Sequence, residues 1–256
     1  KSVGVPDEVF VYIEAGKVFV NSSIFSRNFV KKSGFDAIEA FVKPTMLGET
    51  QKQWFLDTVR ASTATWKFWG SQTQVVQMAL DLSSFDLPEA FRGVYYFTVD
   101  QWDGFRTERR EIVEALAGTP NVVVITGDIH AFYAAEIHVD PDDVSDDPVL
   151  VEYVTAGISS SPVQQIAKSA VDGNPEFAAL AGLVPRFDEV LALASLEYKH
   201  RSSNVNGISI VEVDGAKEIR VTFLEVDDVR SSTPGPVRRR RFRTLAGSNR
   251  VEPIDG

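Results

Sequence analysis

A run of β-branched residues at 122–126 leads directly into Gly-Asp-x-His, and this junction constrains the fold more than any other segment. The run is too short to span a membrane and is rich in valine, so it predicts a buried strand. Asp128 and His130 would then lie at the carboxyl end of that strand, where open α/β sheets bind ligands. A carboxylate and an imidazole together suit a divalent or trivalent metal ion. The alternative is an aspartate that caps a turn beside a surface histidine.

Composition excludes several classes of protein. The 256 residues carry a net charge of −10, which argues against broad nucleic-acid binding because phosphate affinity depends on Lys and Arg. The sequence has no cysteine, so disulfides and thiol nucleophiles are excluded. No apolar stretch reaches about 18 residues, so no membrane-spanning segment is expected. The chain opens on Lys1 without an initiator methionine or signal peptide, and we expect a processed product or a piece of something longer.

Hydrophobic periodicity and turn residues predict the order of elements. Helices are expected over 49–62 and 107–117, the second capped by Thr107, and helical structure recurs within 163–196. Asp214-Gly215 is a strong hairpin signal between two alternating segments. Strand, helix and strand alternate before that hairpin, which indicates an α/β layered fold. Strands are expected at 9–13, 17–20, 65–70, 94–99, 121–126, 134–139, 149–155, 207–213 and 218–226.

Four motifs occur in one order along the chain. They are Met46-Leu47-Gly48-x-x-Gln51-x-x-Trp54-Phe55, Ser62-x-Ala64-x-Trp66-Lys67, Trp102-Asp103-Gly104-Phe105-x-x-Glu108-Arg109 and the 121–130 segment that ends in Gly-Asp-x-His. With these motifs the chain resembles the PhoD-like alkaline phosphatases and related phospholipase D enzymes, which are similar to the calcineurin-like metallophosphoesterases. The resemblance is best over 46–161 and looser through 207–226.

The resemblance implies the fold and the extent of the domain. We expect an α/β calcineurin-like metallophosphoesterase sandwich of mixed β-sheets flanked by helices, with residues 1–256 as its C-terminal part only. The segment 231–256, which includes Arg238–Arg241, is expected as an extended basic tail. The family carries most of its metal ligands in an N-terminal half, as a Cys, a Gly-Asp strand end and an Asp-His-Glu…Asn-Asn segment, and none of these occurs here. That N-terminal half is therefore the expected partner, including as a separate chain.

The resemblance also implies metal ligands. The wider group ends this strand with Gly-His-x-His, and the same spacing here makes Asp128 and His130 the expected ligands. A carboxylate in the first position favours Fe³⁺ or Ca²⁺ over Zn²⁺, in agreement with the iron and calcium centre of the family. The preceding core strand ends at Gln72, whose carbonyl oxygen suits calcium; the alternative for Gln72 is a residue that merely caps a strand edge.

Further residues are assigned to catalysis and substrate binding. Asp103, in an aromatic loop before a helix, could orient a water or protonate the leaving oxygen if burial raises its pKa; the alternative is a helix-capping aspartate. Trp102 could shield a phosphate pocket or anchor the core. Arg109 could clamp phosphate or form a structural ion pair. His200 precedes the late hairpin, where relatives often carry a histidine, and it is the remaining site candidate.

These assignments lead to one expected function and its alternatives. The expected function is hydrolysis of phosphate monoesters or diesters by attack of a metal-activated hydroxide, with a phosphate ester as the substrate. Two metals must be clamped about 3.5–4 Å apart in such a centre, so this chain alone should be incomplete. The alternatives are a phospholipase D of the same family and a non-catalytic, degenerate phosphate-binding module. Exported family members imply a periplasmic or secreted location.

Overall fold

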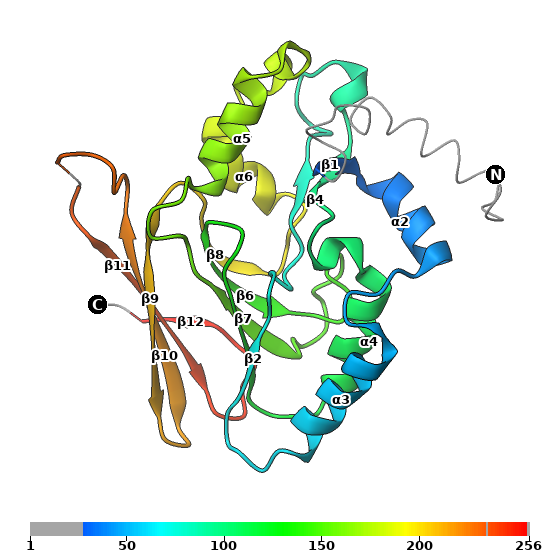
Figure 1. The fold of residues 1–256 in the computed structure, drawn as a ribbon, viewed down its shortest axis with the longest axis vertical. Helices are drawn as coiled ribbons and strands as arrows, with labels where there is room; N and C mark the ends of the chain where they lie inside the picture. Colours follow the sequence, from blue (N-terminus) through cyan, green and yellow to red (C-terminus); the bar gives the residue numbers. More distant parts are fainter. Residues whose placement is uncertain (1–27, 234, 255–256) are drawn as a thin grey trace.

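The computed structural model describes residues 28–233 and 235–254, in which a central β-sheet packs against a second sheet that forms an outer layer (Figure 1). The central sheet has five strands in the order β2-β5-β7-β6-β8. The second sheet has four antiparallel strands in the order β12-β11-β10-β9. Their bounds are β2 (Lys67–Gly70), β5 (Val122–Thr126), β6 (Phe132–Ile137), β7 (Leu150–Val154), β8 (Tyr198–Ser202), β9 (Asn206–Asp214), β10 (Glu218–Val226), β11 (Arg238–Leu245) and β12 (Glu252–Pro253).

Strand β5 explains why the central sheet is buried on both faces. Successive side chains of a strand point to opposite faces. Val122 and Val124 face the layer of helices, whereas Val123 packs in the core between the two sheets. Strands β2, β5 and β7 run parallel, while β6 and β8 run antiparallel to their neighbours. The carboxyl ends of three parallel strands therefore meet at one edge, as the sequence predicted for 121–126.

The second sheet is built on the predicted hairpin. Gly215 has a φ of 53° in the turn between β9 and β10, which confirms the Asp214-Gly215 signal. Alternate residues of β10 are buried against the central sheet, and the rings of Phe132 and Phe223 stack with centroids 4.8 Å apart. The segment predicted as an extended basic tail instead includes a paired strand, β11, because its alternate residues Phe242 and Thr244 are buried.

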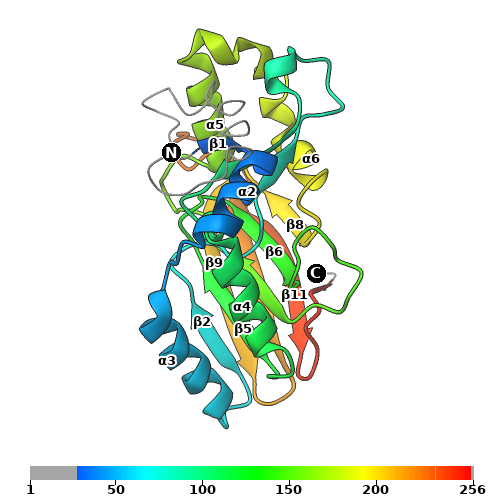
Figure 2. The same ribbon diagram turned by 90° about the vertical axis from the view of Figure 1, so that its right-hand side faces the viewer.

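Two helices cover the other face of the central sheet, as the views in Figures 1 and 2 show: α3 (Gly48–Ala61) and α4 (Arg106–Leu116). The apolar face of α4 is fully buried against the sheet, as the sequence predicted. Thr107 does not cap this helix, which begins one residue earlier. The backbone N–H and the hydroxyl of Thr107 donate instead to the carboxylate of Glu39, at 2.7 and 3.0 Å.

A smaller sheet and three further α-helices complete the described fold. Strand β4 confirms the strand predicted at 94–99, but it joins a three-stranded sheet of order β1-β4-β3. The hairpin predicted at 9–20 lies outside the described residues. Among the helices in the described ranges, none is long and apolar enough to cross a membrane. The remaining bounds are β1 (Asn28–Lys31), α2 (Lys32–Val42), β3 (Ala79–Asp81), β4 (Val94–Thr98), α5 (Val163–Asp172) and α6 (Phe187–Ala192), with a short helical turn at Trp102–Gly104 among others.

Two glycines of β9 and its hairpin allow a matched test of the second sheet. Gly207 has a φ of 153°, and a Cβ there would collide with the backbone carbonyl of Leu224; around Gly215 no atom lies within 4 Å of such a Cβ. We expect Gly207→Ala to lower the free energy of unfolding by about 3 kcal/mol, because the backbone at Leu224 must move to make room for the added Cβ. Gly215→Ala should cost about 1–2 kcal/mol, from its left-handed φ alone. Urea denaturation measures both, and equal losses would contradict this packing.

Candidate functional site

The loops after β5 and β7 form the edge that the sequence singled out. Strand β5 ends at Thr126, and Asp128 and His130 follow in a bend with φ values of 66° and 61°. Left-handed backbone at non-glycine residues costs of order 1–3 kcal/mol and is concentrated at functional sites. Asp128 is exposed and His130 is partly exposed. The bend therefore presents an acidic and an imidazole side chain from a strained backbone.

The imidazole of His130 is held in one tautomer. Its Nδ1 lies 2.8 Å from the carbonyl oxygen of Ser161, which can only accept a hydrogen bond, so Nδ1 carries the proton. The backbone carbonyl of His130 also accepts the N–H of Val163 at 3.1 Å. This arrangement leaves the lone pair of Nε2 for a ligand, as in metal-binding histidines whose other nitrogen donates to a carbonyl.

Gln72 lies on the same edge. The N–H of Ser71 donates to the carbonyl of Ile125 at 3.2 Å, so the parallel pairing of β2 and β5 continues up to the residue before Gln72. Gln72 is exposed, and its Nε2 contacts the Met46 sulfur at 2.7 Å. Gln72 and the Asp128–His130 bend therefore follow the carboxyl ends of two paired parallel strands.

These residues fit part of a metal site. The Nε2 of His130 and the side-chain oxygens of the exposed Asp128 and Gln72 are suitable donors for iron or calcium. Within 28–233 and 235–254, however, no group of three or more His, Cys, Asp or Glu side chains converges to hold a metal. A complete centre would need donors from outside these residues.

Trp102 lies in the core, which corrects its predicted role as a substrate contact. Its side chain is fully buried and meets Trp69 edge-on, with centroids 5.6 Å apart. Its Nε1 donates to Ser71 Oγ at 3.2 Å, and that hydroxyl in turn donates to the carbonyl of Thr73 at 2.6 Å. Trp102 therefore supports the turn that carries Gln72 from the interior of the protein, through the hydroxyl of Ser71.

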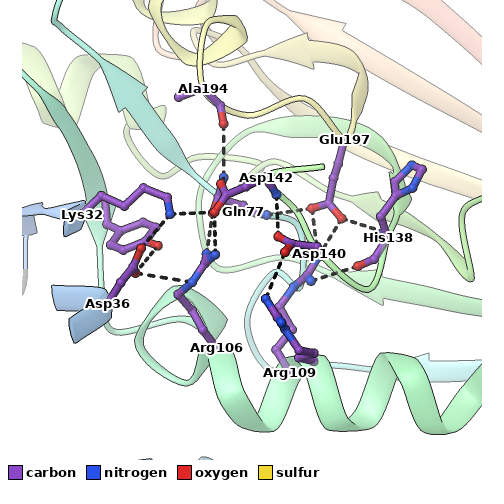
Figure 3. A network of polar contacts seen from close by, with 12 residues as sticks. Lys32, Asp36, Gln77, Arg106, Arg109, His138, Asp140, Asp142, Ala194 and Glu197 are labelled. Atoms are coloured by element: carbon purple, nitrogen blue, oxygen red, sulfur yellow. Dashed lines mark hydrogen bonds and ion pairs between the residues drawn. The ribbon is translucent and has the colours of Figure 1, made fainter. Parts of the chain in front are cut away.

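Arg109 is also structural, in place of the predicted phosphate clamp. Its side chain is 2% exposed and pairs with the fully buried carboxylate of Glu197 at 2.8 Å (Figure 3). Its other nitrogens donate to the carbonyls of Val75, at 2.8 Å, and His138, at 3.1 Å. Because the guanidinium is buried and directed at these three partners inside the protein, it is not placed to meet a substrate.

Asp103 is shut off from solvent at 3% exposure, so its predicted direct role in catalysis is not supported. Its carboxylate accepts the backbone N–H of Met78 at 2.9 Å. Burial raises the pKa of Asp103 to about 7, against the opposing effects of that hydrogen bond and of the charges on Arg106 and Arg109. The pKa of Asp103 is raised as expected, but its carboxyl group is buried in the interior and does not face the solvent where a substrate would bind.

His200 lies between the two sheets and not at the predicted site. Its Nε2 is 3.1 Å from an oxygen of the buried Glu225 carboxylate, and its ring packs against Phe242 with centroids 5.2 Å apart. Strand β8 is the far edge strand of the central sheet, at the opposite side from β2. His200 therefore contributes to the packing between the sheets.

Sequence reasoning missed a set of buried acceptors behind the site. Five successive backbone N–H groups, at residues 75–79, donate to side chains from distant segments. Burial raises the pKa of Glu152 to about 7, against hydrogen bonds that lower it. A signal was present, because Glu152 interrupts an otherwise apolar strand at 150–154. The acceptors are Glu152, Glu197, Asp103 and the hydroxyl of Ser195.

Comparison with solved structures defines the class of protein. A structure described as "Structure of PhoD" aligns with a TM-score of 0.61 over 85% of this chain and 37% of that chain, at 19% sequence identity. The shared fold, with two packed sheets and helices outside them, is a metallophosphoesterase-like sandwich. This result confirms the fold class that the motifs predicted.

The sequence comparisons then identify the family. The sequence model described as "PhoD-like phosphatase" matches residues 19–190, which is more than half of the chain, so the chain belongs to that family. Alkaline phosphatase D of Bacillus subtilis (strain 168) is 30% identical over 118 residues, a region that covers 45% of this chain and 19% of that protein. The chain thus matches less than two thirds of either relative.

The buried ion pair of Arg109 provides a test of the packing behind the site. Arg109→Ala should lower the free energy of unfolding by about 3–5 kcal/mol, because the Glu197 charge stays buried without its partner. On the same helix, Arg110 forms an exposed pair with Asp140, so Arg110→Ala should cost at most about 1 kcal/mol. Guanidinium denaturation compares the two variants, and similar losses would show that Arg109 is not buried in this way.

The raised pKa of Asp103 predicts a pH dependence of stability. The folded protein keeps a proton that the unfolded chain releases, so this stabilisation is present at low pH and is lost as pH rises between about 4 and 7. Relative to Asp103→Asn, the unfolding free energy of the wild type should fall by up to about 1.4 kcal/mol per pH unit in this window. The exposed control Asp146→Asn should follow the wild type. Denaturation from pH 4 to 8 measures this difference, and parallel curves for wild type and Asp103→Asn would refute it.

Proposed function

We propose that this chain forms the C-terminal part of a metal-dependent phosphoesterase of the alkaline phosphatase D type, acting on phosphate esters. The observation that carries the proposal is the His130 imidazole, with Nδ1 committed to Ser161 and Nε2 left for a ligand beside the exposed Asp128. Family membership supports the phosphoesterase class. The partial match to both relatives supports a larger functional unit.

In this proposal Asp128, His130 and Gln72 hold metal at the carboxyl edge of β2 and β5. The donor set suits Fe³⁺ at the carboxylate and imidazole and Ca²⁺ at the oxygens. Metal ions bound there would neutralise phosphoryl charge and increase the acidity of the attacking water. The residues of this chain orient that chemistry: Ser161 fixes the imidazole, and Trp102 supports the Gln72 turn through Ser71.

The remaining ligands would come from the N-terminal half of the same enzyme, in one polypeptide or as a second chain. A location in the periplasm or outside the cell belongs to the same proposal and is supported by the family resemblance. A second candidate is a non-catalytic phosphate-binding module. It is favoured by one observation, the lack of a convergent group of three metal-ligating side chains within the described residues.

Metal analysis and turnover of the intact gene product test the proposal. We expect bound iron and calcium and hydrolysis of p-nitrophenyl phosphate or bis(p-nitrophenyl) phosphate, with the ratio of the two rates defining monoester or diester preference. Release of headgroup from phosphatidylcholine vesicles, in place of either activity, would indicate the phospholipase D alternative. A protein that contains no metal and hydrolyses none of these substrates would support the non-catalytic phosphate-binding module.

Substitution of the two expected ligands tests the site itself. Asp128→Asn and His130→Ala should each reduce kcat/KM on the order of 10²–10³-fold, because a lost ligand removes several kcal/mol of charge stabilisation in the transition state. Steady-state kinetics and metal content should fall together. The control is Asp146→Asn in the exposed acidic loop before β7, which should retain both. Full activity in Asp128→Asn and His130→Ala would place the reaction elsewhere.

A further inference from the structure

One carboxylate links the two loops that carry the expected metal ligands. Glu152 lies in the middle of β7 and is fully buried. Its Oε1 accepts the N–H of Val75 at 2.8 Å and the hydroxyl of Thr126 at 3.0 Å, and its Oε2 accepts the N–H of Val76 at 2.7 Å. Three donors from two segments therefore converge on a single side chain.

The positions of these donors relate Glu152 to the site. Thr126 ends β5 two residues before Asp128, and Val75 lies three residues after Gln72 in the segment that leaves β2. Glu152 itself is paired in register with Val124 of β5. The side chain thus ties the segment after β2 to the end of β5, from a rigid position inside the sheet.

We propose that Glu152 is a positioning residue, which fixes the separation of the Gln72 loop and the Asp128–His130 bend so that both can meet one metal centre. This role rests on the proposed function. It adds to that function a residue that does not itself bind metal or substrate but sets the geometry of the site. Loops are otherwise imprecise supports, and sites depend on hydrogen bonds from rigid elements to hold their ligands.

The chemistry of the side chain explains why a carboxylate is needed. The N–H groups of Val75 and Val76 are buried, and a carboxylate offers two acceptor oxygens that together meet these donors and the Thr126 hydroxyl. A glutamine would fill the same volume, but its amide group brings two more donors to a place where three already converge. Glu152→Gln therefore replaces one of the two acceptor oxygens by a donor and breaks part of the link with little change in shape.

A buried glutamate in the adjacent strand provides a matched control. Glu136 of β6 is nearly as buried; it pairs with Lys199 of β8 at 3.0 Å and with Arg250 at 3.1 Å, and it accepts the N–H of Val251 at 2.9 Å. Arg250 and Val251 lie in the segment between β11 and β12, and none of the three partners belongs to either ligand loop. Glu136→Gln should destabilise the fold without moving the metal site.

Metal affinity separates a positioning role from a merely structural one. In the full-length protein, Glu152→Gln should bind calcium 10–100-fold more weakly by calorimetric titration with Ca²⁺, and it should retain less iron. The calcium affinity of Glu136→Gln should stay within about twofold of the wild type, even where its melting temperature falls by as much as that of Glu152→Gln. Equal affinity in both variants, or equal loss in both, overturns the proposal.

A milder pair of variants guards against a Glu152→Gln protein that does not fold. Thr126→Val is nearly isosteric but lacks the hydroxyl that donates to Glu152, whereas Thr126→Ser keeps it. We expect a several-fold loss of calcium affinity in Thr126→Val and wild-type affinity in Thr126→Ser. Identical affinities in these two proteins overturn the link through Thr126.

Hydrogen exchange distinguishes failure of this inference from failure of the proposed function. Glu152→Gln should raise amide exchange in peptides that cover 72–78 and in peptides that cover 126–130, whereas Glu136→Gln should raise it in neither. A wild-type protein that binds no metal would end the proposed function, while this exchange pattern would still establish the coupling of the two loops. Faster exchange in one segment only, or in neither, overturns the coupling itself.

Discussion

The candidate site depends on a buried carboxylate that accepts backbone hydrogen bonds. The segment after β2 has no strand partner at residues 75 and 76, and buried peptide groups without acceptors are costly. Glu152 satisfies both groups, and Glu197 and Asp103 satisfy the next two. Each carboxylate is shielded from water, and hydrogen bonds and nearby cations such as Arg109 offset the cost of its desolvation. The path of the chain away from Gln72 is thereby fixed.

The described residues form two hydrophobic cores, which lie on opposite faces of the central sheet. The core between the sheets, which contains Phe132, Tyr153 and Phe223, holds the second sheet against the central one. The core under α4 holds the helices and contains Trp69 and Trp102. The parallel strands separate the two cores, so their carboxyl ends emerge between both layers. A site at this edge is therefore supported on both sides by packed side chains and not by loops alone.

Local patterns predicted most of the elements, because their signals lie within a few residues. The valine-rich strand at 122–126 and the Asp214-Gly215 hairpin are examples, and the structure contains both. The basic segment at 238–241 was predicted less well, because four arginines mask the alternate burial of Phe242 and Thr244. Its pairing with β10 is a tertiary contact that no short pattern contains.

The site residues divide in the same way. Asp128, His130 and Gln72 follow the ends of neighbouring parallel strands, and their role as metal ligands stays a prediction. Trp102, Arg109 and His200 proved to be interior residues, because a motif shows that a residue is required and not which way its side chain faces. Distant partners such as Glu197 for Arg109 decide that question, and they become visible only when the chain is folded.

The long-range character of the Glu152, Glu197 and Asp103 contacts has a consequence for the order of assembly. The acceptors for residues 75–78 lie 25 to 120 positions further along the chain. Contacts of such sequence separation form late, because the entropy of closing large loops must be overcome first. The Gln72 turn can reach its final shape only after β7 and the approach to β8 have joined the sheet. A nascent or half-folded chain would therefore lack the arrangement of loops that the proposed metal site requires.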